Sequence, residues 1–239
     1  MIAKAQNNPL LYINKIEIIK KNVPDDYLNG ILDSINILSC RKGQQFVMEG
    51  APVNGLFFLC KGKAKVLKTG IYGKEQILRF VGEGEIIGHR GFATSNKYGI
   101  SAVALEDSIL CNITNTVMER MLRDLPELTY RLMLFYAEEL DRSETKVKAL
   151  AQMTVREKVI DALLYLNRKF GINHKGFIDI ILSRKEIADY SGTTNEQVTR
   201  VISALKSEGL LLVSGKRLKL KNLNMLKKEI IEHNFFLDA

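Results

Sequence analysis

Residues 194–200 bring together side chains of the kinds that read DNA bases. Asn195, Glu196, Thr199 and Arg200 recur at helical spacing and would share one face of a helix. Asn matches the edge of adenine, Glu the amino group of cytosine, Arg a guanine or a phosphate, and the methyl group of Thr the methyl group of thymine. Polar residues on an outer helix face are usually only solvated, so their meaning depends on the elements that position them.

The surrounding sequence predicts two short helices joined by a sharp turn. Ser183 is placed to cap the first helix, with Glu186 at the capping-box position, and Gly192 permits the turn. Thr193 or Thr194 can cap the second helix. The buried face of that helix would consist of apolar residues at helical spacing: Val198, Val201, Ile202 and Leu205.

A tight hairpin is predicted directly after the second helix. Two apolar runs, 210–213 and 217–220, flank the turn Ser214-Gly215-Lys216. Lys216, Arg217 and Lys219 lie at or beside its tip, within reach of phosphates. The capped helices, the turn glycine and the basic hairpin together predict a winged helix-turn-helix, with double-stranded DNA as the partner.

The charge distribution favours the same partner. The chain of 239 residues has a net charge of +8. Residues 1–150 carry 20 Lys and Arg against 17 Asp and Glu, whereas residues 151–239 carry 15 against 10. The excess of positive charge is therefore densest in the C-terminal third, as expected of a segment that binds a polyanion.

The preceding sequence changes periodicity twice. Residues 1–36 have loosely helical spacing, and from about 38 to 113 short strands alternate with glycines, which predicts a small barrel or roll. A short helix is expected at 115–122 and a long one at about 125–149. A strand, 177–182, is expected before the helix-turn-helix.

The long helix carries an apolar stripe that must be buried somewhere. The stripe could pack on its own domain or pair with the same helix of a second subunit. Its members are Leu128, Leu132, Phe135, Tyr136 and Leu140. We therefore expect an α+β chain with three parts: a β-roll with flanking helices at 1–122, a long helix at 123–150 and a winged helix-turn-helix at 151–239.

Other classes of protein find little support in the sequence. No nucleophile is paired with a base, and no phosphate-binding loop or metal-ligand cluster is visible, so we expect neither an enzyme nor a metal site. The three cysteines lack CxxC spacing and are expected to be neutral or buried thiols. No apolar run is long enough to span a membrane, and no secretory signal is present, which predicts a cytoplasmic protein.

Over about residues 25–225 the chain resembles the cyclic-AMP receptor protein/FNR family of bacterial transcription regulators. The resemblance rests on two segments, KGQQFVMEGAPVNGLFFLCKGKAKVLKTGIYGKEQILRFVGEGEIIG for the roll and SRKEIADYSGTTNEQVTRVISALKSEGLL for the helix-turn-helix. It implies that the roll at 1–122 is an effector domain and that the long helix at 123–150 is a dimerisation helix, which joins a homodimer. RNA polymerase is implied as a further partner. The resemblance also implies DNA contacts by Glu196, Arg200 and Thr199. Asn195 departs from the Arg of the cyclic-AMP receptor, which predicts a different DNA site.

The effector site departs further from the family pattern. Members that bind cyclic nucleotides carry a second Glu for the ribose hydroxyl and an Arg for the phosphate. Here His89 stands at the position of the ribose-binding carboxylate. The position of the phosphate-binding Arg falls near Lys97, and no Arg stands there; the nearest cations are Lys97 itself and Arg90. The expected pocket residues are Gly84, Glu85, Ile87, Gly88, His89, Arg90 and Tyr98.

Tight cyclic-AMP binding is therefore not expected. The effector is an unidentified small molecule, or the protein has none and is regulated by its abundance. No cofactor is assigned, and the N-terminal cysteines of an FNR-type iron–sulfur cluster are absent. His89, without a second ligand, is expected to be a hydrogen-bonded structural residue. The alternative function is a cyclic-nucleotide-binding module that acts through a protein partner, but it leaves residues 183–220 without a role.

Overall fold

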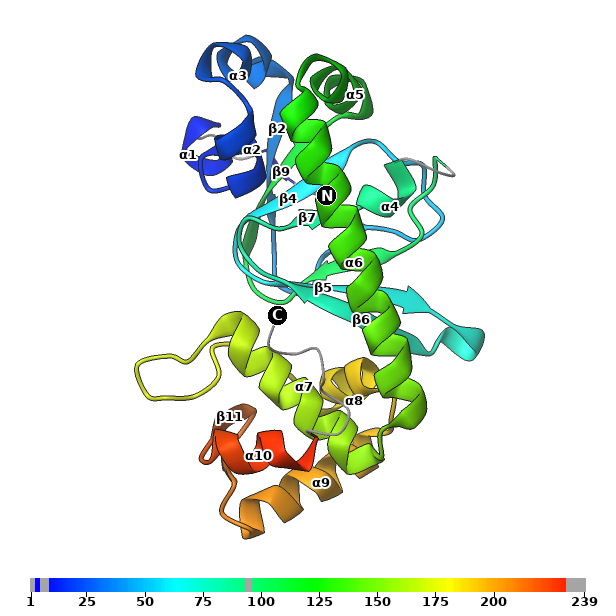
Figure 1. The fold of residues 1–239 in the computed structure, drawn as a ribbon, viewed down its shortest axis with the longest axis vertical. Helices are drawn as coiled ribbons and strands as arrows, with labels where there is room; N and C mark the ends of the chain where they lie inside the picture. The colour runs from blue at the N-terminus through cyan, green and yellow to red at the C-terminus, as the bar shows by residue number, and fades with distance from the viewer. Residues whose placement is uncertain (1–2, 5–8, 93–95, 231–239) are drawn as a thin grey trace. The chain divides into compact units, whose positions relative to one another are not determined.

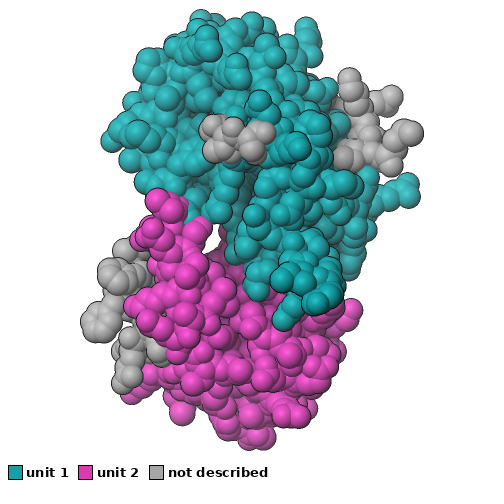
Figure 2. Space-filling model, turned by 90° about the vertical axis from the view of Figure 1, so that its right-hand side faces the viewer, with its two compact units in different colours: residues 1–139 teal, residues 140–239 magenta. Residues whose placement is uncertain are grey.

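The computed structural model describes residues 3–4, 9–92 and 96–230 (Figure 1). The chain divides into two compact units, 1–139 and 140–239 (Figure 2). The boundary falls within the long helix α6, Pro126–Gln152, so each unit contains part of this helix.

The first unit consists of two antiparallel sheets and a set of short helices. The five-stranded sheet has the order β1-β2-β9-β4-β7, and the four-stranded sheet has the order β3-β8-β5-β6. The strands are β1 Ala3–Lys4, β2 Ile35–Cys40, β3 Gln45–Val47, β4 Leu56–Lys61, β5 Ala64–Thr69, β6 Glu75–Val81, β7 Ile86–Ile87, β8 Ser101–Ala104 and β9 Ser108–Ile113. The helices are α1 Leu10–Ile13, α2 Glu17–Asn22, α3 Asp25–Ile31, α4 His89–Phe92, α5 Asn115–Asp124 and two single 3-10 turns, Leu32–Ser34 and Ile71–Gly73.

The sequence of strand β4 is apolar from Leu56 to Cys60 rather than alternating. Successive side chains of a strand point to opposite faces of the sheet. Phe57 lies in the core between the two sheets, whereas Phe58 lies in a second core, where helices α1, α2, α3, α5 and α6 cover the outer face. Because both faces of the five-stranded sheet are buried in this way, its central strands have no solvent side. The predicted roll is confirmed.

Two local predictions in this unit are corrected. The N-terminal helical segment ends before Ile35, which begins β2 and pairs with Ile113 of β9. The short helix α4, at the predicted effector cassette, was not expected. The three cysteines are free and buried, as expected.

The second unit contains the C-terminal turns of α6 and the predicted winged helix-turn-helix. Its further elements are α7 Val155–Phe170, α8 Arg184–Ser191, α9 Asn195–Ser207, β10 Leu211–Ser214, β11 Arg217–Leu220 and α10 Leu223–Glu229. The predicted strand at 177–182 is wrong. Only an isolated bridge joins Ile172 and Ile178, and Ile178 N–H donates to the carbonyl of Leu218. The rest of this segment is a loop because no continuous partner strand lies beside it.

Candidate nucleic-acid interface

The two helices of the motif are capped and joined as the sequence predicts. The Ser183 hydroxyl accepts from the backbone N–H of Glu186, whose carboxylate accepts from the Ser183 N–H, which completes the capping box. Gly192 ends α8 in the left-handed region at φ 64°, where a side chain would be strained. Thr194 caps α9 by accepting from Gln197 N–H. These local contacts set where α9 begins.

Helix α9 separates a buried face from a polar face. Val198, Ile202 and Leu205 are buried, and Val201 is partly buried. Asn195, Glu196, Thr199 and Arg200 are all exposed. The structure therefore brings the four predicted base-reading residues together on one solvent-facing surface at the N-terminal end of the helix.

Two of these side chains are already oriented by the helix. The Thr199 hydroxyl donates to the carbonyl of Asn195 at 2.8 Å, so its donor is used within the helix. The pKa of Glu196 is lowered by its own backbone N–H, by the Thr194 hydroxyl and by Arg200. The carboxylate is therefore ionised at neutral pH, the state in which it can only accept hydrogen bonds.

The exposed polar face of α9 extends one turn beyond the four predicted residues. Ser203 and Lys206 follow Thr199 and Arg200 at helical spacing, and both are exposed. The spacing was visible in the sequence, but nothing there set the length of the helix. A lysine at this distance from the helix start is suited to a phosphate rather than a base edge.

The predicted basic wing is present as a hairpin with a two-residue turn. Ser214 pairs with Arg217, and Gly215 takes a positive φ of 60° at the tip. Lys216 and Arg217 are exposed, while Lys219 is partly buried and its ammonium donates to the carbonyl of Lys175 at 3.2 Å. The first two cations are therefore the ones placed for phosphate contacts.

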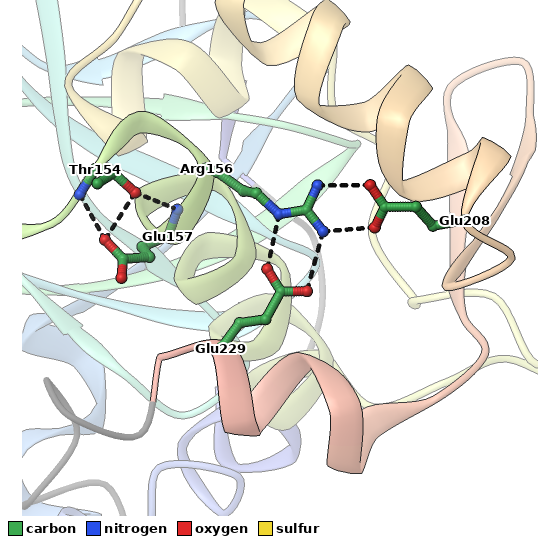
Figure 3. A network of polar contacts seen from close by, with 5 residues as sticks. All are labelled: Thr154, Arg156, Glu157, Glu208 and Glu229. Carbon is green, nitrogen blue, oxygen red and sulfur yellow. Dashed lines mark hydrogen bonds and ion pairs between the residues drawn. The ribbon is translucent and has the colours of Figure 1, made fainter.

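An ion-pair network that the sequence did not reveal fastens the far end of α9 (Figure 3). Arg156, near the start of α7, donates through Nη1 and Nη2 to the Glu208 carboxylate at 2.9 and 2.6 Å. Its Nε and Nη2 donate to Glu229, at the end of α10, at 2.7 and 3.0 Å. One guanidinium thus joins three helices, because its planar fork can serve two carboxylates at once.

We expect Arg156→Ala to lower the free energy of unfolding of the second unit by about 2 kcal/mol, because two carboxylates lose their shared cation and face each other. Arg156→Lys should recover part of this, since an ammonium cannot make both bidentate contacts. Thermal unfolding of the full chain, followed by circular dichroism, measures the change. Lys185→Ala is the control, because it breaks a single i,i+4 ion pair, with Asp189 of the same helix. Equal losses in both variants would contradict the structural role of Arg156.

The apolar stripe predicted as a dimer seam instead packs mainly on its own unit. Leu128 and Leu132 are buried in the core beneath the five-stranded sheet, and Phe135 and Tyr136 pack against that core. Only Leu140 of the predicted set is exposed. A stripe at helical spacing does not reveal which surface will cover it, and here the roll covers four of its five members.

The exposed apolar face of α6 lies elsewhere on the helix. Tyr130, Met133, Leu140 and Val147 are 50%, 56%, 60% and 67% exposed, and they recur at intervals of three, seven and seven residues. Ala137 is also exposed and continues the pattern. An apolar repeat of this period is typical of a two-stranded coiled coil.

Part of the predicted effector pocket is used by the core of the roll. The side chain of Ile87 is buried between the sheets. The Tyr98 hydroxyl lies 2.7 Å from Asn54 Oδ1 and 2.8 Å from the carbonyl oxygen of Gly55. The Tyr98 ring also occupies the space in which a Cβ at Gly88 would stand, 2.8 Å away, so Gly88 permits this packing. Ile87 and Tyr98 therefore contribute to the core of the roll.

The remaining polar groups of this region form a cluster around His89. Arg79 Nε lies 3.5 Å from Glu139 Oε2 and Arg79 Nη1 lies 3.9 Å from Glu85 Oε2. Arg79 Nη2 also donates to the carbonyl of Ile86. Arg90, one of the two cations noted in the sequence, is exposed. The Gly84 N–H donates to the carbonyl of Leu59 in β4.

His89 is buried, but it is not the hydrogen-bonded residue that we expected. Among the described residues, neither ring nitrogen has a hydrogen-bond partner, and Nε2 lies 4.0 Å from Glu139 Oε2. Its ring packs edge-on against Phe135 and Tyr136, at centroid distances of 5.0 and 5.3 Å. Burial, reinforced by Arg79 and Arg90, lowers the pKa of His89 to about 3. The ring is thus neutral at physiological pH.

Within the described part of the chain, no group of three or more His, Cys, Asp or Glu side chains is arranged to hold a metal ion. No helix in residues 3–4, 9–92 and 96–230 is long and apolar enough to cross a membrane.

Known proteins match both halves of the chain. A family model described as a cyclic nucleotide-binding domain matches residues 37–124, and one described as a Crp-like helix-turn-helix domain matches residues 157–229. The transcriptional regulatory protein btr of Bordetella pertussis is 31% identical over 182 residues, which cover 75% of this chain and 74% of the relative. The transcriptional activator protein anr of Pseudomonas aeruginosa is 29% identical over 179 residues, covering 74% and 72%. The solved structure of FixK2 from Bradyrhizobium japonicum matches with a TM-score of 0.73 and 25% identity, covering 81% and 96%.

A roll of the cyclic-nucleotide-binding type, a long helix and a winged helix-turn-helix define a class of DNA-binding regulators. The chain belongs to the cyclic-AMP receptor protein/FNR family of bacterial transcription regulators.

Proposed function

We propose that this chain is a homodimeric regulator that reads a specific DNA site with the polar face of α9. The observation that carries the proposal is the exposure of Asn195, Glu196, Thr199 and Arg200 on one face of a helix that begins at a capping box. A recognition helix contacts base edges with residues at its N-terminal end, where these side chains lie. Lys216 and Arg217 of the wing supply phosphate contacts, and Thr194 supports the start of the helix.

The dimer is proposed to form along the exposed repeat of α6. The occupant we propose for this face is the same helix of a second copy, because a heptad face is complementary to itself across a two-fold axis. Two reading helices related by such an axis would meet successive major grooves, with half-sites about one helical turn apart. Family regulators of this type act as dimers, which agrees with the seam.

A regulator of this kind acts on promoter DNA, so we propose a cytoplasmic location and RNA polymerase as a further partner. The relative in Pseudomonas aeruginosa is named a transcriptional activator.

For the roll we propose an effector other than cyclic AMP at high affinity. A buried neutral His89 stands where a carboxylate would bind ribose, and the ionisable groups nearest to it include Glu139. Losing a buried charge-assisted contact costs roughly 2–5 kcal/mol, or about 30-fold or more in affinity.

Isothermal titration of the full chain with cyclic AMP and with cyclic GMP is therefore expected to give no saturable heat at micromolar ligand. The same preparation should bind its selected DNA site, which establishes that the protein is active. Saturable heat at micromolar concentration would contradict the proposal for the roll and leave the DNA-binding proposal intact.

The DNA-binding proposal is tested by selecting sites for the purified chain from random duplexes. We expect a near-palindromic site whose affinity falls steeply with salt, because phosphate contacts release counterions. Failure to enrich any sequence, with binding that depends only on salt, would overturn it.

A further inference from the structure

The C-terminal turns of α6 and the helix-turn-helix lie in one compact unit, and a single lysine links them by an uncommon contact. Lys146 projects from α6, and its Nζ lies 3.6 Å from the centroid of the Tyr190 ring. Tyr190 belongs to α8, the first helix of the motif, and is buried. A lysine ammonium over the face of an aromatic ring is attracted by the ring quadrupole.

The aromatic ring is itself held rigidly. Tyr165 of α7 stacks on Tyr190, with the centroids 5.2 Å apart and the planes inclined by 15°. The cation therefore rests on one face of a stacked pair rather than on a mobile side chain. Lysines on a surface usually extend their ammonium groups into water, which this one does not.

Charged groups on neighbouring elements also act on this ammonium. The pKa of Lys146 is lowered to about 8, mainly by burial; Asp161 of α7 opposes the change and Lys158 of α7 adds to it. Arg168 of α7 acts on both Asp161 and Tyr190. Lys146 is still a cation at neutral pH, and its partial removal from water strengthens the contact with the ring.

The position of Tyr190 makes this contact relevant to DNA reading. Tyr190 stands two residues before Gly192, which makes the turn, and five residues before Asn195, where α9 begins. The same turns of α6 carry Leu140 and Val147 of the proposed dimer seam. A contact between α6 and α8 therefore connects these residues of the proposed dimer seam to the start of α9.

We propose that Lys146 is a positioning residue that fixes the orientation of the helix-turn-helix relative to the dimer seam, so that two reading helices meet a palindromic site without prior adjustment. The inference rests on the proposed function. Without this contact each helix-turn-helix would stay folded, but its orientation would have to become ordered on binding. That ordering costs free energy and lowers the affinity for two half-sites together.

Two duplexes test this, one with the full selected palindrome and one with a single half-site. Lys146→Met is expected to weaken binding to the full site about tenfold and to leave half-site binding within about twofold. Lys146→Arg, which keeps a cation able to stack on the ring, should restore full-site affinity. Lys148→Met, which removes an exposed lysine two residues away, is the matched control and should bind like the unaltered chain.

The partner ring provides a second set of variants. Tyr190→Phe keeps the aromatic face and should behave like the unaltered chain, whereas Tyr190→Leu should match Lys146→Met. Combining Lys146→Met with Tyr190→Leu should add little to either change, because both remove the same interaction. Independent, additive losses would overturn the inference.

The pH profile gives a readout that a merely structural lysine would not produce. Full-site affinity of the unaltered chain should fall as pH rises through about 8, where Lys146 loses its proton, while Lys146→Arg stays level. Stability should change in the opposite direction. Because the folded-state pKa lies below the ordinary value of 10.5, the unfolded chain binds the proton more tightly, and this group makes folding more favourable as pH rises from about 8 to 10.5.

The outcomes separate the two proposals. If the unaltered chain selects no palindromic site, the proposed function fails. If it selects one and Lys146→Met binds that site equally well, only the role of Lys146 fails. Equal weakening on the full site and on the half-site would mean local damage to the helix-turn-helix, which also overturns the inference.

Discussion

Replacing Glu196 and Arg200 together by alanine is expected to abolish sequence-specific DNA binding and to leave only weak, salt-sensitive binding. A well-placed side chain contact to a base is worth about 1–3 kcal/mol of discrimination. A dimer loses four such contacts at once, so the specific affinity should fall by about 10³-fold or more. The wing and other cations remain, and non-specific binding should therefore persist.

Fluorescence anisotropy with the selected duplex and with a scrambled duplex measures the specific and the non-specific affinity. The control is Glu127→Ala with Arg131→Ala, an exposed pair on α6 with the same residue types, the same spacing and an Nε–Oε1 distance of 2.9 Å. It removes equal and opposite charges far from α9 in sequence. Retention of specific binding by the Glu196 and Arg200 variant would refute the reading role of this face.

Introducing charge into the exposed repeat of α6 is expected to produce monomers. Met133→Glu with Leu140→Glu places carboxylates at two positions that we propose to face their own copies across the two-fold axis. Burying each apolar side chain contributes about 1.5–3 kcal/mol, so the dimer dissociation constant should rise by about 10³-fold or more. Because a monomer engages only one half-site, full-site affinity should fall by about 10²-fold or more.

Sedimentation equilibrium measures the association state. Leu11→Glu is the control, because Leu11 is also an exposed apolar residue but lies on α1, outside the proposed seam. If the doubly charged variant remained a dimer at micromolar concentration, the seam would have to lie on another surface. Dissociation by both variants would indicate a general loss of folding rather than a specific interface.

The helix-turn-helix was predictable because its determinants are local. Ser183 with Glu186, Gly192 and Thr194 act on backbone groups within a few residues, and the capping and turn rules apply before any tertiary contact forms. The periodicity of α9 likewise separates a buried face from a polar one within a single helix. The predicted strand at 177–182 failed for the opposite reason, because a strand needs a partner that local sequence does not supply.

The roll was predictable as an architecture but not as a site. Glycines and short apolar runs identify the strands, whereas the fate of individual pocket residues depends on which distant side chains fill the space. His89 could be located in the sequence, but its burial between Phe135 and Tyr136 comes from α6, more than forty residues away. Its lack of a hydrogen-bond partner among the residues that the structure describes could not be foreseen from the sequence around it.

The exposed polar face of α9, which we propose reads bases, and the basic wing were therefore determined by the sequence itself, through helical spacing, caps and turn glycines. Tertiary structure decided which face of α6 the roll covers and which face remains for a second copy, because an apolar stripe specifies burial without specifying the surface that buries it. It also placed Arg156 beside Glu208 and Glu229, which are 52 and 73 residues away. The contact of Lys146 with Tyr190 arises in the same way, because only folding brings the ammonium over the ring.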